Sequence, residues 1–290
     1  MIRKREDGYH DLETIFVPIY GLHDELEIQP IIGPARNGRD ISFVQEGIAV
    51  DCPAEDNLIV KCYRMMAAKY PQIQPVEVRF RKNIPFGAGL GGGSSDAAHM
   101  AIALNELFAL GLSREQLAAE VRPLGADCPF FVYNTPCYAE GIGEKLTPID
   151  LPLKGVRIIL IKPDEGVSTR EAYSGIIRHP EAEGQIKSIF FTQSGLAAKR
   201  SFSEAIREPE GVFVNDFEQT VFPLHPTIEA IKKRLLDAGA FYASMSGSGS
   251  TVFGLFEDNA ESRSDTRLRL LEQEFASMIL LDDTFGEWKS

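Results

Sequence analysis

The densest group of residues suited to chemistry is the segment FGAGLGGGSSDAA, in which five glycines fall within the seven residues Gly87 to Gly93. Two hydroxyl side chains, Ser94 and Ser95, follow directly, and the segment then continues into a helical pattern. Glycines let backbone amides approach phosphate oxygens closely, and a helix N-terminus adds a favourable potential for anions. The pattern predicts an anion-binding loop, and a tight loop packed against another backbone is the structural alternative.

Two common nucleotide-binding motifs share part of this pattern, and the context excludes both. The spacing of Gly87, Gly89 and Gly92 satisfies GxGxxG, but Pro85 and Phe86 separate the preceding strand from the first glycine. The region about 20 positions later is predicted helix and turn, whereas the dinucleotide motif requires an acidic residue at the end of a strand there. No GK[ST] sequence occurs in the chain, so a Walker loop is excluded as well.

Four other polar positions or segments are explained by local structure alone, as helix caps or turns. Asp127 is followed by Pro129, which is typical of an N-cap, and Asn57 precedes the first long helical pattern in the same way. The segment DGYH, at residues 7–10, is typical of a turn, and SGSGST, at residues 246–251, of a flexible turn.

The first half of the chain is predicted to be rich in strands. Partial alternation and β-branched or aromatic content predict strands at residues 12–20, 24–30, 40–46 and 48–51. Residues 57–70 have the spacing of an amphipathic helix, and the alternation of Val76, Val78 and Phe80 with charged residues predicts a strand before Pro85. A helix from about residue 95 to 110 follows the glycines, and a second helix begins at the capping box of Ser113.

The pattern changes after CYAEGIGEKLTPIDLPLKG, and the buried-strand sequence VRIILIKP opens a predicted second domain. Helices are predicted at residues 169–177 and 226–238, the latter ended by Gly239, and a last amphipathic helix at SRSDTRLRLLEQEF. The segment ASMSGSGSTVFGLFED reads as a turn followed by a strand. Helices interleaved with strands of antiparallel character predict an α+β fold rather than a doubly wound parallel sheet.

Composition limits the classes of partner. The chain has 290 residues, 44% of them hydrophobic and 25% charged, which suits one large or two closely packed soluble domains. A formal net charge of −12 argues against binding to nucleic acid or to an anionic membrane. Four cysteines without CxxC, and no leader-like start, predict a cytoplasmic protein. Five histidines without HExxH give no metal site made by protein alone.

The glycine segment PFGAGLGGGSSDAA resembles the second motif of the GHMP small-molecule kinases. Its triple glycine before two serines is similar to that of the 4-diphosphocytidyl-2-C-methylerythritol kinases of isoprenoid-precursor synthesis. Three further segments, DGYHDLETIF, LGADCPFFV and SMSGSGSTVFGLF, agree in the expected order, so that the resemblance covers residues 7–256. The segment DGYH distinguishes this family from other members of the superfamily.

The resemblance implies a fold, a reaction and a set of site residues. The fold would be the two-domain GHMP kinase architecture, with a ribosomal protein S5 domain 2-like domain at 1–150, an α/β sandwich at 151–290, and ATP and substrate between them. The reaction would be ATP-dependent phosphorylation of the 2-hydroxyl of 4-diphosphocytidyl-2-C-methyl-D-erythritol with Mg²⁺, and Asp127 would be the catalytic base. The ATP-binding residues would be Asn57, Pro85, Phe86, Gly87, Ala88, Gly89, Leu90, Gly91, Gly92, Gly93, Ser94 and Ser95. The phosphate-region third motif would be Ser246, Gly247, Ser248 and Gly249.

The resemblance also implies a cytosine pocket. Tyr9 would stack on the base, His10 would read its polar edge, and Phe16 would line the pocket. From the second domain, Tyr173 would supply the opposing ring and Thr169 a hydroxyl that contacts the substrate.

One departure from the family leaves alternatives open. The family carries an Ala-Lys-(apolar)-Asn strand upstream of DGYH, with the Lys against the catalytic aspartate, whereas this chain starts six residues before Asp7 and IRKRE does not match. We therefore expect the chain as given to bind ATP but to be a poor kinase. Another GHMP small-molecule kinase and a non-catalytic nucleotide-binding relative remain the alternative functions.

Overall fold

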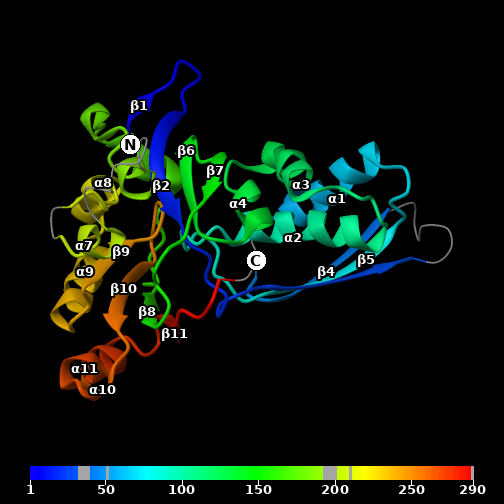
Figure 1. Cartoon of the computed structure of the whole chain (residues 1–290). Coiled ribbons are helices and arrows are strands. Elements are labelled where there is room, and N and C mark those ends of the chain that lie inside the picture. Colours follow the sequence, from blue (N-terminus) through cyan, green and yellow to red (C-terminus); the bar gives the residue numbers. More distant parts are fainter. Residues whose placement is uncertain (32–39, 50–51, 192–200, 209–210, 289–290) are drawn as a thin grey trace.

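The strands of the computed structural model, which describes residues 1–31, 40–49, 52–191, 201–208 and 211–288, form three sheets (Figure 1). The first sheet has the order β1 (Arg3–Lys4), β2 (His10–Phe16), β6 (Cys137–Gly141), β7 (Lys145–Pro148). The second has the order β3 (Glu25–Pro30), β5 (Val76–Lys82), β4 (Ile41–Gly47). The third has the order β11 (Ile279–Thr284), β8 (Val156–Ile161), β10 (Val252–Glu257), β9 (Tyr242–Met245).

In Figure 1 most helices lie beside two of the sheets, the one that contains β4 and β5 and the one that contains β9 and β10. The helices of the first half are α1 (Leu58–Lys69), α2 (Gly92–Leu107), α3 (Arg114–Val121) and α4 (Cys128–Tyr133), with short 3₁₀ turns η2 (Ala54–Asp56) and η3 (Arg122–Leu124). Those of the second half are α5 (Thr169–Ser174), α6 (Lys187–Phe190), α7 (Phe202–Ala205), α8 (Glu218–Leu224), α9 (Pro226–Asp237), α10 (Ala260–Ser264) and α11 (Thr266–Glu274), with the 3₁₀ turn η4 (Pro180–Ala182). No described helix is long and apolar enough to cross a bilayer.

The second sheet packs one face against α1 and α2. Val76, Val78 and Phe80 of β5 are buried in that core, while the alternate residues of the strand are exposed, as the sequence predicts. The prediction of antiparallel pairing is wrong for one neighbour, because β4 runs parallel to β5. The helix α1 connects these two strands, and a parallel pair requires such a crossover.

The third sheet is covered on both faces, which explains why VRIILI is a continuous apolar run. Ile159 and Ile161 of β8 belong to a core with α9 and α11, whereas Ile158 and Leu160 belong to another core. This second core includes Leu151 and partly buried residues between Ile15 and Leu22, so that it joins the two halves of the chain. The boundary at residue 150 stays a prediction.

Local signals fix most element ends, and several predicted bounds are wrong. The helix α2 begins at Gly92, three residues before the predicted start, because the last loop glycines adopt helical geometry. The capping box at Ser113 is present. No strand forms at residues 48–49, and residues 50–51 of that predicted strand lie outside the described part. The predicted last helix is divided at Asp265, whose side chain caps α11. The α+β class is confirmed.

Candidate active site

The glycine loop joins the end of β5 to the N-terminus of α2. Gly91, with φ of 66°, occupies the N-cap position, and the amide of Ser95 donates to the carbonyl oxygen of Gly91 at 2.9 Å. The first amides of α2 have no hydrogen-bond partner within the helix. The dipole of this 16-residue helix adds a partial positive charge at the same end. This geometry suits an anion at the end of the loop.

The loop packs backbone against backbone on the predicted third motif, which follows β9. The hydroxyl of Ser246 donates to the carbonyl oxygen of Gly89 at 2.9 Å, and the amide of Thr251 donates to that of Ala88 at 3.2 Å. A Cβ at Gly89 would lie 2.3 Å from the carbonyl oxygen of Ser246. Close packing against another backbone therefore explains why residue 89 is glycine. The same contact places the glycine loop beside the third motif.

The other loop glycines differ in what surrounds them. A Cβ at Gly91 would lie 2.8 Å from the ring of Phe131, so this glycine also has a packing reason. Gly87 has no atom within 4 Å of an added Cβ, and Gly93 has only a side-chain carbon of Leu58 at 3.7 Å. Packing does not require glycine at either of these exposed positions. The left-handed φ of 67° favours glycine at Gly87, whereas at Gly93 the approach of a ligand remains as the reason.

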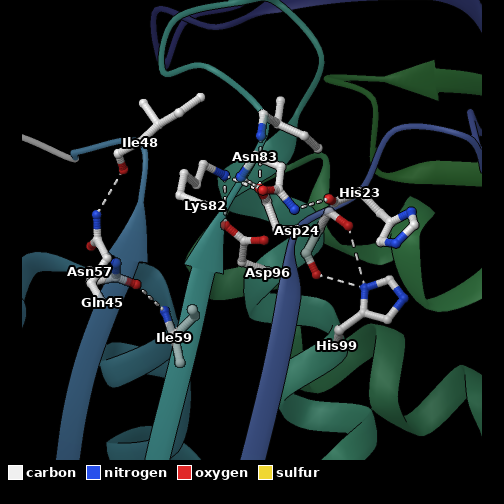
Figure 2. Close-up of polar contacts among 12 residues, drawn as sticks. His23, Asp24, Gln45, Ile48, Asn57, Ile59, Lys82, Asn83, Asp96 and His99 are labelled. Atoms are coloured by element: carbon white, nitrogen blue, oxygen red, sulfur yellow. Dashed lines mark hydrogen bonds and ion pairs between the residues drawn. The ribbon is translucent and has the colours of Figure 1, made fainter. Parts of the chain in front are cut away.

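A buried ion cluster lies beneath the loop, as Figure 2 shows. The Nζ of Lys82, the last residue of β5, contacts Asp24 and lies 3.0 Å from Oδ2 of Asp96 in α2. Asp24 Oδ1 also accepts from the amides of Asn83 and Ile84, at 2.6 and 2.8 Å. The cluster thus ties both ends of the glycine loop to one charge.

The three charged side chains of this cluster are almost inaccessible, with 5% exposure for Lys82, 4% for Asp24 and 10% for Asp96. Burial raises the pKa of Asp96 to about 7, an effect that Lys82 opposes and Asp24 reinforces. The sequence prediction missed these residues. Lys82 lies on the same buried face of β5 as Val76, Val78 and Phe80. A lysine at such a position is the signal that could have revealed the cluster, because lysine is rarely buried without a charged partner.

Asp127 occupies the N-cap position of α4, but its side chain makes no capping hydrogen bond. The prediction of a capping carboxylate is therefore wrong. The residue is accessible to solvent, yet protein atoms surround the carboxylate closely enough that burial raises its pKa. Next to it, burial raises the pKa of the Cys128 thiol, and a hydrogen bond with Ser94 opposes this effect. The base candidate and the end of the glycine loop thus lie side by side.

Predicted substrate residues from both halves of the chain meet near Asp127. The ring of His10 stacks on Tyr173 with centroids 5.1 Å apart, and Tyr9 is 59% exposed. Burial raises the pKa of Tyr173, and the charge of Asp127 adds to this effect, so that the two groups lie within electrostatic range. In this structure His10, rather than Tyr9, is therefore the neighbour of Tyr173.

The remaining predicted residues fall into the same region or have a structural partner. Phe16 packs against Phe130 of α4, with centroids 5.2 Å apart, and the hydroxyl of Thr169 lies 3.4 Å from that of Ser248. The side chain of Asn57 caps α1 by accepting from the amide of Ile59 at 2.9 Å (Figure 2). The capping interpretation of Asn57 is confirmed, and its role near adenine stays a prediction.

Two protein-family models match the chain. GHMP kinases N terminal domain matches residues 57–135, and GHMP kinases C terminal matches residues 197–266. The chain is 47% identical over 255 residues to 4-diphosphocytidyl-2-C-methyl-D-erythritol kinase of Bacteroides thetaiotaomicron, a match that covers 88% of this chain and 86% of that protein. Identity to the enzyme of the same name from Nitratidesulfovibrio vulgaris is 37% over 258 residues, which covers 87% of this chain and 84% of that protein.

Solved structures agree with these matches. A crystal structure of 4-(cytidine 5'-diphospho)-2C-methyl-D-erythritol kinase superposes with a TM-score of 0.70 at 30% identity, covering 98% of this chain and 93% of that chain. Homoserine kinase from Cytophaga hutchinsonii superposes with a TM-score of 0.68 at 17% identity, covering 95% of this chain and 93% of that chain, and shows the shared fold. The two-domain GHMP kinase fold is confirmed.

Proposed function

The chain belongs to the 4-diphosphocytidyl-2-C-methyl-D-erythritol kinase family of the GHMP kinases, and from this membership we propose which residues carry the reaction. The activity is ATP-dependent phosphorylation of 4-diphosphocytidyl-2-C-methyl-D-erythritol in isoprenoid-precursor synthesis. The observation that carries the residue assignment is the meeting of Asp127, the glycine loop and Tyr173. We propose that the phosphoryl group moves to the 2-hydroxyl of the substrate.

In this proposal Asp127 accepts the proton of the attacking hydroxyl. A base must be ionised and unpaired to do so, and Asp127 makes no capping bond that would hold its carboxylate. The amides at the start of α2 hold the phosphates, and the third motif around Ser246 supports the loop from the other side. Phosphoryl transfer needs mainly positioning and charge stabilisation, which these elements supply.

We propose that ATP binds together with Mg²⁺, and the oxygen ligands that Mg²⁺ prefers are available at this site. Within the described residues no group of three or more His, Cys, Asp or Glu side chains could hold a metal ion. Mg²⁺ in phosphoryl-transfer sites is held largely by substrate phosphates, water and one or two protein oxygens. The hydroxyls of Ser94 and Ser95 beside the phosphate position would provide such oxygens. The ion would neutralise phosphate charge when bound.

The cellular setting follows from charge and composition. We propose a cytoplasmic enzyme with domains at 1–150 and 151–290, a small-molecule substrate, and no nucleic-acid or membrane partner. The net charge of −12 supports this, because it repels polyanions while the loop amides attract phosphate locally.

The assignment of function is tested by a substrate panel. Purified protein is assayed for ADP release with 4-diphosphocytidyl-2-C-methyl-D-erythritol, homoserine and mevalonate at equal concentrations. Slow turnover of the diphosphocytidyl compound alone is expected. Preference for a free alcohol would identify another GHMP kinase, and nucleotide binding without turnover of any alcohol would identify a non-catalytic relative.

Changing Tyr9 to alanine is expected to weaken the diphosphocytidyl substrate far more than ATP. The exposed ring is free to stack on a base, and one such stack contributes about 1 to 3 kcal/mol. The measurement is KM for each substrate, with Tyr9→Phe as the control that keeps the ring. Equal weakening of both substrates by Tyr9→Ala would contradict a cytosine role.

Changing Gly93 to valine is expected to weaken ATP binding at least about tenfold while the protein stays folded. Outside the helix's own backbone, an added Cβ has only a side-chain carbon of Leu58 within 4 Å, and no left-handed φ is required. At the exposed start of α2, however, the new side chain would crowd the amides proposed to hold the phosphates. Titration calorimetry with ATP measures the loss. Gly286→Val is the matched control, since Gly286 is exposed with nothing within 4 Å of an added Cβ. Unchanged ATP affinity would place the phosphates elsewhere.

A further inference from the structure

The hairpin between β6 and β7, next to β2 and α4 in Figure 1, turns on the sequence EGIGEK. Gly141 and Gly143 both adopt left-handed φ, 72° and 106°. The amide of Gly143 donates to the carbonyl oxygen of Glu140 at 3.2 Å and closes the turn. The sequence patterns that point to the kinase fold assign no role to this turn.

The carboxylate of Glu144 holds the hairpin in place. Its side chain is 6% exposed, accepts from the amide of Ile142 at 2.7 Å, and lies 3.4 Å from the guanidinium of Arg122. A Cβ at Gly141 would lie 2.4 Å from this carboxylate. Gly141 is therefore explained by the packing of the turn itself.

Gly143 faces different atoms. An added Cβ would lie 3.5 Å from Oδ1 of Asp127 and 3.5 Å from Cζ of Phe16, both ordinary van der Waals distances. The turn would not clash with such a methyl group, but the space beside the carboxylate would be filled. The residue thus borders the base candidate and an aromatic ring predicted to line the substrate site.

We propose that Gly143 is a specificity-determining residue, which leaves room beside Asp127 and Phe16 for the methyl group carried by the acceptor carbon. This inference rests on the proposed function. The 2-hydroxyl of a 2-C-methyl-erythritol is a tertiary alcohol, so its carbon brings a methyl group to the base together with the oxygen. A secondary alcohol needs less space at the same position, and the wall formed by Phe16 offers that methyl an apolar surface.

The test compares two acceptors in the wild-type protein and in Gly143→Ala: the diphosphocytidyl derivative of 2-C-methyl-D-erythritol and that of erythritol. The added methyl group occupies the space of the substrate methyl. We expect kcat/KM for the methylated acceptor to fall about 10- to 200-fold relative to the unmethylated one, the range that one methyl-sized group contributes to selectivity.

Gly239→Ala is the matched control, because Gly239 has a φ of 99°, close to that of Gly143, and only the guanidinium of Arg267, at 3.5 Å, lies within 4 Å of an added Cβ. It carries similar backbone strain and should leave the ratio of the two acceptors unchanged. Equal losses for both acceptors in Gly143→Ala, or no loss, would overturn the specificity role. Failure of the wild-type protein to phosphorylate either acceptor would instead contradict the proposed function.

Discussion

Replacing Asp127 by asparagine is expected to lower kcat by about 10² to 10⁴, the usual contribution of a general base. The amide keeps the size of the carboxylate but cannot accept the proton of the attacking hydroxyl. Because Asp127 makes no capping hydrogen bond, the structure should lose little stability, and KM for both substrates should change little. Steady-state ADP release and thermal unfolding of the two proteins measure these effects.

The pH dependence of the wild-type enzyme supplies a second readout for Asp127. Burial raises its pKa, so the ionised base is lost as the pH falls through a value above the ordinary aspartate pKa of about 3.9. In the wild-type protein, kcat/KM should therefore fall on the acid side with an apparent pKa above that of ordinary aspartate. The residual activity of Asp127→Asn should not show this fall. Asp237→Asn, an exposed change in α9, is the control. A loss of less than about tenfold would leave Asp127 without a role in the chemical step.

Replacing Lys82 by methionine is expected to lower the free energy of unfolding by about 3 to 5 kcal/mol, the cost of breaking a buried ion pair from one side. The change leaves the carboxylates of Asp24 and Asp96 facing each other with little solvent. Since the cluster holds both ends of the glycine loop, KM for ATP should rise as well.

Urea unfolding at several pH values distinguishes the loss of this charge from a simple packing defect. The folded-state pKa of Asp96 is already raised to about 7, and losing Lys82 would raise it further. Stability linked to a raised carboxyl pKa is present below the unfolded value, about 3.9, and is lost as the pH rises through the folded value. The deficit should therefore grow as the pH rises above about 7, where Asp96 ionises in the folded wild-type protein but stays protonated in the folded variant. Lys61→Met, at an exposed ion pair, should change stability by less than about 0.5 kcal/mol. A deficit independent of pH would show that the charge of Lys82 does not matter.

The amino-acid sequence by itself determined the features that depend on local geometry. Five closely spaced glycines before two serines predict a loop at a helix N-terminus, and the loop lies there. Alternation in β5, the apolar run of β8 and the capping box of Ser113 each specify an element through short-range physics. These patterns were sufficient for the fold class, whereas the kinase family was predicted from the resemblance of four segments to known family motifs.

Only the tertiary structure decided which distant residues meet. Three contacts join segments far apart in the chain: the ion pair of Lys82 with Asp24, the packing of Gly89 on Ser246, and the stack of His10 on Tyr173. A sequence pattern records which face of an element is buried, but it does not record what lies against that face. For the same reason Gly143 resembled any turn glycine, and the distance to the Asp127 carboxylate gave it a place in the site.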